Sequence, residues 1–296
     1  MQKILIWLTL LFCAQPAFAQ DTLKAVLLVD RPLPQETYIY RLLELALKNQ
    51  QQPYKLEIEV VDATQPRRVK IVSSSPKNYV IALGNRSEHE ELLQPIYIPI
   101  QLGLGLGHRI MLTRADVEDR LKNVKSLADL SKFIFAQGLG WSDVKILRDA
   151  GLKVHTPADT TSIPGMLMRK RVDLYPRGLF EIDLEYKRYA PDHPGLVIDE
   201  NIVLTYPLAS FFYVRKGNAL LHDAIRKGLK KAYYSGQLQD LIMTDPTFSK
   251  TLRNIHLGTR VKIEVPVKNL DISEKALSAL KEFIFMPGKK VGEKVR

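Results

Sequence analysis

A strand, a glycine-bearing turn, a helix and a second strand follow one another from residue 133 onward, and this order constrains the fold more than any other stretch. Residues 133–136 are apolar, residues 137–143 form a polar turn with two glycines, and residues 144–150 have the spacing of an amphipathic helix. Gly151 ends that helix, and residues 152–155 are again rich in apolar side chains. Such a βαβ unit predicts two parallel strands joined by a right-handed crossover.

The turn in this unit is also a candidate binding site. The first amides of a helix lack intrahelical partners, and the helix dipole adds positive potential, so an anionic group can be held there. The turn residues either cap the helix and pack an aromatic ring, or they face a ligand. These candidates are Gly140, Trp141, Ser142 and Asp143.

A second polar cluster follows another short predicted strand, at residues 172–174. Arg177 and Glu181 come just after it, so they either line a crevice or pair with each other. Arg109 and Arg114 lie at the ends of a predicted strand over residues 108–113, where an arginine can clamp a carboxylate with two hydrogen bonds or simply lie on the surface.

Strands alternate with helices along the chain, which predicts an α/β protein with largely parallel sheets. Long extended runs on either side of the central region suggest that the chain leaves a first lobe, builds a second, and returns. Tyr206, near the return, either stacks on a ligand or packs at the hinge. The expected division is residues 20–114 with 206–270 for lobe 1, 115–205 for lobe 2, and 271–296 for a last helix and basic tail.

Three local features leave alternatives or give sharper predictions. Residues 67–72 fit either a strand or a short helix. The glycine-rich residues 103–107 have the wrong spacing for a phosphate loop and precede a strand, which favours an extended crossover between lobes. Ser126 followed by Asp129 has capping-box spacing and predicts a helix start.

The N-terminus predicts export. Residues 1–3 form a short start with one basic side chain, Lys3, residues 4–13 are almost wholly apolar, and Ala17-Phe18-Ala19 is a cleavage box. Together they indicate a signal peptide over residues 1–19, cleaved after Ala19. The single cysteine, Cys13, lies inside it, so disulfides, thiolate metal sites and cysteine nucleophiles are not expected in the mature chain.

The net charge of +11 suits an acidic ligand or an anionic surface. The basic residues are spread along the chain without a nucleic-acid-binding module, so nucleic acid is not an expected partner. His108, His155 and His222 lack the mutual spacing of a metal site, and no metal or cofactor is predicted.

The order of these motifs resembles the periplasmic solute-binding proteins of the type 2 fold, in particular their amino-acid-type branch of transporter substrate-binding domains. The resemblance covers about residues 110–245 and depends on four segments: residues 124–130, 135–154, 168–174, and 211–218 with 235–238. The first lobe lacks the family's usual aromatic-rich Pro-Phe opening. Ser73-Ser74-Ser75 and Asn85-Arg86-Ser87 stand where ligand contacts are expected, but they do not match the amino-acid-binding pattern.

The resemblance implies two lobes, each a mostly parallel sheet flanked by helices, that close on a small polar solute, acidic or zwitterionic and amino-acid-like. It implies a non-catalytic periplasmic binder that passes its solute to a membrane permease or a sensor receptor. The alternative is an enzyme on the same fold, such as a cyclohexadienyl-type dehydratase, with Glu181 as general acid. No nucleophile–base pair is evident, and fold alone does not establish function.

Overall fold

The structure is a computed structural model that describes residues 21–102, 107–206, 208–246, 248, 257–266 and 273–283. The predicted signal peptide, residues 103–106 of the glycine-rich crossover and the basic tail lie outside these residues. Within the described ranges, no helix is long and apolar enough to cross a membrane.

Strands and helices alternate, as the sequence predicts. The strands are β1 (Leu23–Val29), β2 (Tyr54–Val60), β3 (Tyr79–Gly84), β4 (Leu93–Ile96), β5 (His108–Arg114), β6 (Ile134–Ala136), β7 (Lys153–His155), β8 (Tyr175–Gly178), β9 (Leu196–Ile198), β10 (Ile202–Thr205), β11 (Ser210–Arg215) and β12 (Val261–Glu264). The α-helices are α1 (Tyr38–Asn49), α2 (Gln65–Ser74), α3 (Ser87–Leu92), α4 (Ala115–Leu121), α5 (Leu127–Leu130), α6 (Ser142–Asp149), α7 (Ile163–Met168), α8 (Ile182–Tyr189), α9 (Ala219–Tyr234), α10 (Gln237–Thr244) and α12 (Glu274–Glu282). Short 3-10 turns are η1 (Thr160–Ser162), η2 (Ala190–Asp192) and η3 (Leu257–Thr259).

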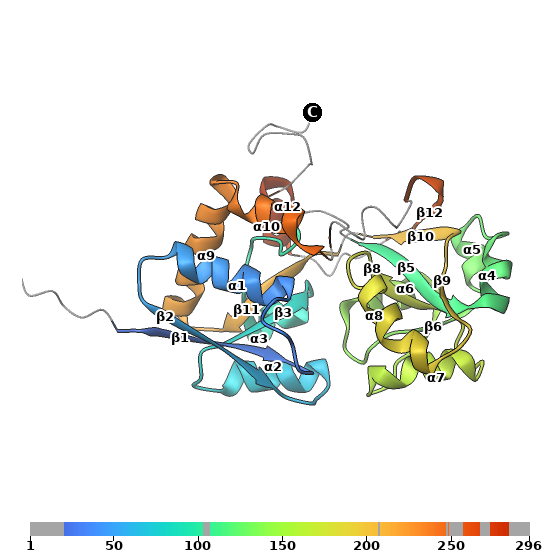
Figure 1. Cartoon of the computed structure of the whole chain (residues 1–296), viewed down its shortest axis with the longest axis horizontal. Coiled ribbons are helices and arrows are strands. Elements are labelled where there is room, and N and C mark those ends of the chain that lie inside the picture. Colours follow the sequence, from blue (N-terminus) through green and yellow to red (C-terminus); the bar gives the residue numbers. More distant parts are fainter. Residues whose placement is uncertain are drawn as a thin grey trace, which may run out of the picture.

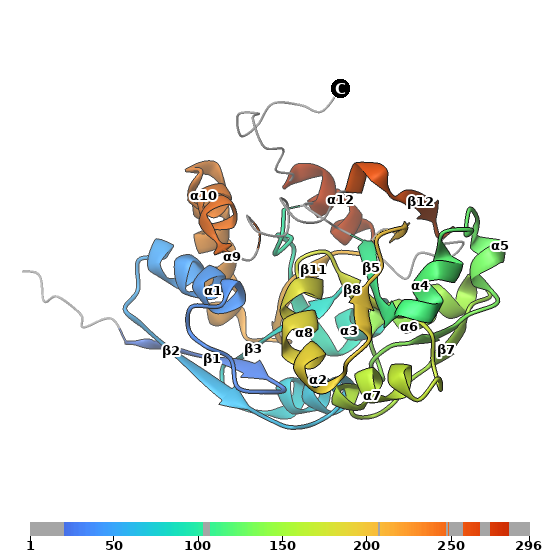
Figure 2. The same ribbon diagram turned by 45° about the vertical axis from the view of Figure 1, so that its right-hand side comes forward.

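Two lobes are visible, each built around one larger sheet, and the second lobe also holds the two-stranded sheet β6-β7 (Figure 1). The first sheet has the order β2-β1-β3-β11-β4, with α1, α2, α9 and α10 around it. The second has the order β12-β10-β5-β8, with β9 also paired to β5. The view turned by 45° shows α1 beside α9 and α10 in the first lobe (Figure 2). The α/β, two-lobe fold class predicted from the sequence is confirmed.

The strand directions differ from the mostly parallel pairing that was expected. In the first sheet β1 runs parallel to β2 and β3, but β11 returns antiparallel between β3 and β4. In the second sheet β5 is antiparallel to β8, β9 and β10, and β10 runs parallel to β12. Strands β9 and β10 run in the same direction along one edge of β5, where β9 pairs with residues 112–114 and β10 with residues 108–109.

The sheet membership also bears on where one lobe ends and the other begins. Strands β5 and β12 fall inside the residue ranges expected for lobe 1, yet both hydrogen-bond into the second sheet with β10. The division of the chain into lobes remains a proposal, and these pairings favour grouping β5 and β12 with the second lobe.

The local predictions around the central unit are confirmed. Strands β6 and β7 pair in parallel on either side of α6. Ser126 and Asp129 form a complete capping box, in which the Ser126 hydroxyl accepts from the Asp129 amide and the Asp129 carboxylate accepts from the Ser126 amide. The ambiguous residues 67–72 are helical, inside α2, where Pro66 occupies the first turn as its fixed φ allows.

Candidate functional site

The turn before α6 is one of the places where the second lobe contacts the first. The carbonyl oxygen of Gly140 accepts hydrogen bonds from Gln65 Nε2 at 3.3 Å and from Arg86 Nη1 at 3.1 Å. Ser142 Oγ donates to the carbonyl oxygen of Gly84, at the end of β3, over 3.2 Å. The lobes are therefore held together by contacts from the glycine-bearing turn that the sequence singles out.

Glycine is required at the centre of this contact for two reasons. Gly140 has a φ of 81°, in the left-handed region that glycine occupies without strain. A Cβ at this position would lie 2.5 Å from Pro66 Cγ, on α2 of the other lobe. The absence of a side chain lets the two backbones approach in the closed arrangement.

A buried ion pair lies on the opposite side of α6. Arg109 Nε donates to Asp143 Oδ1 at 2.6 Å, and the Tyr206 hydroxyl donates a short hydrogen bond to the same oxygen. Burial alone would raise the pKa of Asp143, but the Arg109 charge and these two hydrogen bonds hold that pKa below its usual value. Burial, and then the Asp143 charge, raise the pKa of Tyr206 well above its ordinary range.

Arg109 and Tyr206 flank the two connections that join the lobes. Arg109 is near the start of β5, and Tyr206 directly follows β10. The Tyr206 amide donates to the Gly107 carbonyl oxygen at 3.2 Å, so the outgoing and returning chains run side by side. The ion pair thus ties α6 to both hinge segments.

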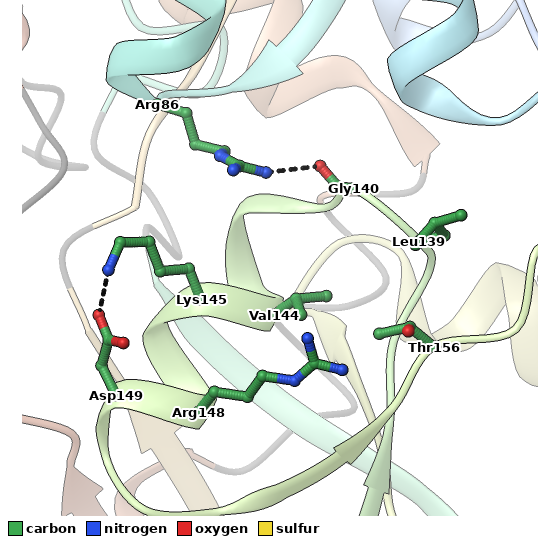
Figure 3. A pocket seen from close by; sticks show the side chains of 8 residues that line it. All are labelled: Arg86, Leu139, Gly140, Val144, Lys145, Arg148, Asp149 and Thr156. Atoms are coloured by element: carbon green, nitrogen blue, oxygen red, sulfur yellow. Dashed lines mark hydrogen bonds and ion pairs between the residues drawn. The ribbon is translucent and has the colours of Figure 1, made fainter.

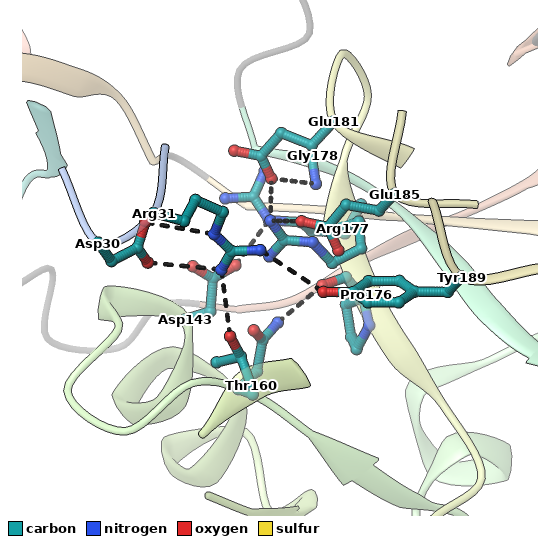
Figure 4. A network of polar contacts seen from close by, with 12 residues as sticks. Asp30, Arg31, Asp143, Thr160, Pro176, Arg177, Gly178, Glu181, Glu185 and Tyr189 are labelled. Atoms are coloured by element: carbon teal, nitrogen blue, oxygen red, sulfur yellow. Dashed lines mark hydrogen bonds and ion pairs between the residues drawn. The ribbon is translucent and has the colours of Figure 1, made fainter. Parts of the chain in front are cut away.

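A second buried cation lies at the end of β8 (Figure 4). Arg177 Nη2 contacts Glu185 Oε1 at 2.6 Å and Glu181 Oε2 at 2.9 Å, and its guanidinium carbon lies 4.6 Å from the centre of the Trp141 ring. Burial alone would lower the pKa of Arg177, but the charges of Glu181 and Glu185 raise it well above its usual value. The two carboxylates differ in access, because the Glu181 side chain is 52% exposed and that of Glu185 14%.

The first lobe contributes its own charges at the end of β1. Arg31 contacts Tyr189 Oη at 3.5 Å and Thr160 Oγ1 at 3.4 Å, both in the second lobe, as Figure 4 shows. Asp30 pairs with Arg31 at 3.3 Å and with Arg68 at 3.5 Å. Burial would raise the pKa of Asp30, but the charges of Arg68 and Arg31 hold it below its usual value.

Arg31 and Arg177 converge on one face of α8. Their partners Tyr189 and Glu185 are four residues apart on that helix, and residues at this spacing are neighbours on a helix surface. A cation from each lobe therefore meets the same helical surface.

Several buried nitrogen donors in this region have no hydrogen-bond partner among the described residues. They are Arg68 Nε, Asn85 Nδ2, Arg86 Nε and Arg177 Nε. Leaving a buried donor unsatisfied costs about 1–3 kcal/mol, and more for a charged group. The acceptors Gln137 Oε1 and Glu185 Oε2 are also buried without a partner among the described residues. Unsatisfied groups of both kinds favour ordered water or a ligand that carries acceptor and donor groups.

The structure brings together most of the candidate residues predicted from the sequence. Gly140, Trp141, Ser142, Asp143, Arg109, Arg177, Glu181 and Tyr206 all lie on α6, β8 and the hinge segments beside the first lobe. Arg177 and Glu181 do pair with each other, one of the two alternatives considered.

Arg114 lies apart from this group, at the far end of β5. It is buried, donates to the carbonyl oxygens of Leu167 and Val172 at 2.9 Å each, and pairs with Asp116 and Asp173. All these contacts are inside the second lobe, so they organise that lobe, and a ligand-binding role for Arg114 remains a prediction.

Sequence reasoning missed the first-lobe residues Asp30, Arg31 and Gln65, and Glu185 on α8. Asp30 and Arg31 directly follow the buried strand β1, and side chains just beyond the carboxyl ends of parallel strands are where α/β proteins bind ligands. That signal was available in the sequence. The described residues hold no group of three or more His, Cys, Asp or Glu side chains that could bind a metal.

The two lobes, the strand order and the placement of the βαβ unit define the type 2 periplasmic-binding fold, and comparison with solved structures agrees. An ancestral arginine-binding protein bound to arginine is 19% identical, with a TM-score of 0.55 over 77% of this chain and 99% of its own. The GluR0 ligand-binding core from Nostoc punctiforme, in complex with L-glutamate, is 17% identical, with a TM-score of 0.53 over 76% and 99%.

A histidine kinase sensor domain with similarity to periplasmic binding proteins is 13% identical, with a TM-score of 0.55 over 77% of this chain and 97% of its own. The sequence matches no protein-family model and has no significant match among curated proteins. Identities this low establish the fold alone.

Proposed function

We propose that this protein binds a small polar solute carrying a carboxylate between its two lobes, without catalysis, and delivers it to a membrane permease or a sensor receptor. The predicted signal peptide supports a periplasmic location. The solved neighbours include both transporter-type binding proteins and a kinase sensor domain, which is consistent with either kind of partner.

The observation that supports this proposal most directly is the state of Arg177. It is a buried cation with an unpartnered Nε, and one of its two carboxylates is on an exposed side chain, Glu181. A solute carboxylate could replace Glu181 at Arg177 and also satisfy Nε, because guanidinium and carboxylate groups pair through two parallel hydrogen bonds. Glu185, which is less exposed, would stay in place and orient the arginine.

The enzymatic alternative would use Glu181 as a general acid. A carboxyl group that stays protonated near neutral pH is generally found in a buried, apolar setting. Glu181 is instead half-exposed, accepts from the Gly178 amide at 3.1 Å and pairs with Arg177. Glu181 therefore lacks the buried, apolar setting of such an acid, which favours binding over dehydration.

The proposal is tested by a thermal-shift screen of the mature protein with amino acids, short peptides, sugars and organic acids. A ligand present at about a hundred times its Kd adds about 2.7 kcal/mol of stability. We expect a carboxylate-bearing hit that mass spectrometry recovers unchanged. A hit that is consumed would establish an enzyme, and a screen without any hit would contradict solute binding.

Two variants locate the solute once a hit is known. Glu181→Gln should raise the affinity several-fold, because it removes the carboxylate that competes for Arg177. Arg177→Gln should abolish binding, whereas Arg188→Gln, in the exposed last turn of α8, should leave it unchanged. A weaker affinity in Glu181→Gln would mean that Glu181 itself contacts the solute, and our assignment of its role would be wrong.

A further inference from the structure

A cavity of about 310 Å³ opens beside the lobe contact, on the outer face of α6 (Figure 3). The second lobe contributes Leu139 and Gly140 from the turn, Lys145, Arg148 and Asp149 from α6, and Thr156 after β7. The first lobe contributes Arg86, which reaches down to Gly140, as the figure shows. The volume lies within the range of about 300–1,000 Å³ common for small-molecule sites.

This cavity is separate from the buried ion pair described above. Successive residues of an α-helix are turned by about 100°, so Lys145 and Arg148 project from the side of α6 opposite to Asp143. Asp143 faces the hinge through Arg109 and Tyr206, whereas Lys145 and Arg148 are exposed. A ligand in the cavity would not contact the hinge cluster.

The charges around the cavity leave one cation without a carboxylate. Lys145 Nζ pairs with Asp149 at 2.6 Å, and Arg86 pairs with the exposed Glu88. Arg148 donates to the carbonyl oxygen of Val154 at 3.0 Å and forms no ion pair in the described part of the chain. The balance of the lining is therefore positive, and the excess charge is on Arg148.

An unsatisfied donor and an apolar wall define the ligand further. Arg86 Nε is buried and has no hydrogen-bond partner among the described residues, although both terminal nitrogens of the guanidinium are engaged. Leu139 and Val144 provide apolar surface on the same lining, and Leu139 is 42% exposed, which is high for a leucine. Donor groups beside apolar surface on the same lining suit a small carboxylate with an apolar body.

We propose that this cavity is a second binding site, which takes a small organic carboxylate through Arg148 and Arg86 and holds the lobes closed. Because Arg86 and Arg148 belong to different lobes, a ligand that contacts both binds the closed arrangement more tightly than an open one. By linkage such a ligand raises the affinity of any solute that also requires closure, and the solute raises the affinity of the carboxylate by the same factor. The binding step stands alone, whereas the coupling rests on the proposed function.

The binding step is tested with benzoate as the probe, titrated calorimetrically into the mature protein, with sulfate as a probe that lacks an apolar body. We expect benzoate to bind and Arg148→Gln to weaken it about tenfold or more, as loss of a charge-assisted hydrogen bond requires. Arg188→Gln is the matched control, because Arg188 is also an exposed arginine in the last turn of its helix. It should leave the affinity unchanged.

Three outcomes would overturn the second site. The first is that benzoate does not bind at saturating concentration. The second is that Arg148→Gln and Arg188→Gln change the affinity for benzoate equally. The third is that Arg177→Gln abolishes benzoate binding while Arg148→Gln leaves it unchanged. The last would place benzoate between the lobes at Arg177. The proposed function can fail independently, since it depends on the solute screen. If both ligands bind, benzoate should raise solute affinity in the wild type and not in Arg148→Gln.

Discussion

Replacing Gly140 by alanine should open the lobes while leaving each lobe folded. The new Cβ would lie 2.5 Å from Pro66 Cγ and 2.6 Å from Pro66 Cδ. Carbon atoms normally meet at about 3.5 Å, so the surfaces must separate by about 1 Å. Pro66 is a rigid ring in the first turn of α2 and cannot rotate away, so the two lobes must move apart.

The matched control is Gly151→Ala at the other end of α6. Gly151 has the same φ of 81° as Gly140, and a Cβ there would meet nothing within 4 Å. Both variants carry the cost of a left-handed alanine, about 1–2 kcal/mol. They should therefore lose similar stability in urea unfolding, and a difference between them in lobe closure reports the contact with Pro66.

Closure can be measured as a distance between spin labels on the two lobes. Lys55→Cys places one label on an exposed side chain of β2, and Lys122→Cys places the other in the turn after α4. The chain's single native cysteine, Cys13, lies within the predicted signal peptide, so the mature protein carries labels only at these two positions. With the best solute from the screen present, wild type and Gly151→Ala should populate the short distance, and Gly140→Ala a longer one. Equal distance distributions in the two alanine variants would refute the reasoning.

Further predictions concern the hinge and its ion pair. Gly107→Ala should lower the free energy of unfolding in urea more than Gly151→Ala does, because its Cβ would lie 1.4 Å from the backbone oxygen of Tyr206. Equal decreases in the two variants would show that the two connections can move apart without loss of stability. Asp143→Asn should lower the free energy of unfolding by about 3–5 kcal/mol, because it leaves the buried Arg109 without its carboxylate. The exposed Asp119→Asn should lower it by about 0–1 kcal/mol. Similar losses in the two variants would contradict a buried ion pair. The folded-state pKa of Asp143 is lowered, so its stabilising contribution is complete above about pH 4 and is lost as the pH falls through the lowered value. The stability difference between wild type and Asp143→Asn, measured as a function of pH, should shrink in acid, and a constant difference would contradict this sign.

The sequence determined the local structure of this protein because local structure depends on near neighbours. Apolar spacing and Gly151 specified the unit from β6 to β7, and the Ser126–Asp129 spacing specified a helix start. The helical form of residues 67–72 was undetermined, because a charged pair beside three β-branched residues fits either period. It is α2, beginning after Thr64 with Pro66 in its first turn.

The tertiary structure decided which charged side chains meet. Arg109 and Asp143 are 34 residues apart, and Arg31 and Tyr189 are 158 apart, yet each pair is in contact. Such pairings follow from strand order and direction, and the antiparallel insertion of β11 and the return of β12 to the second sheet have no local signal. Sequence spacing could name Arg109, Arg114 and Arg177 as candidates. The tertiary structure shows which of these arginines lie at the lobe interface, because α6, β8 and the end of β1 meet there. Arg114 lies elsewhere, and its contacts are all within the second lobe.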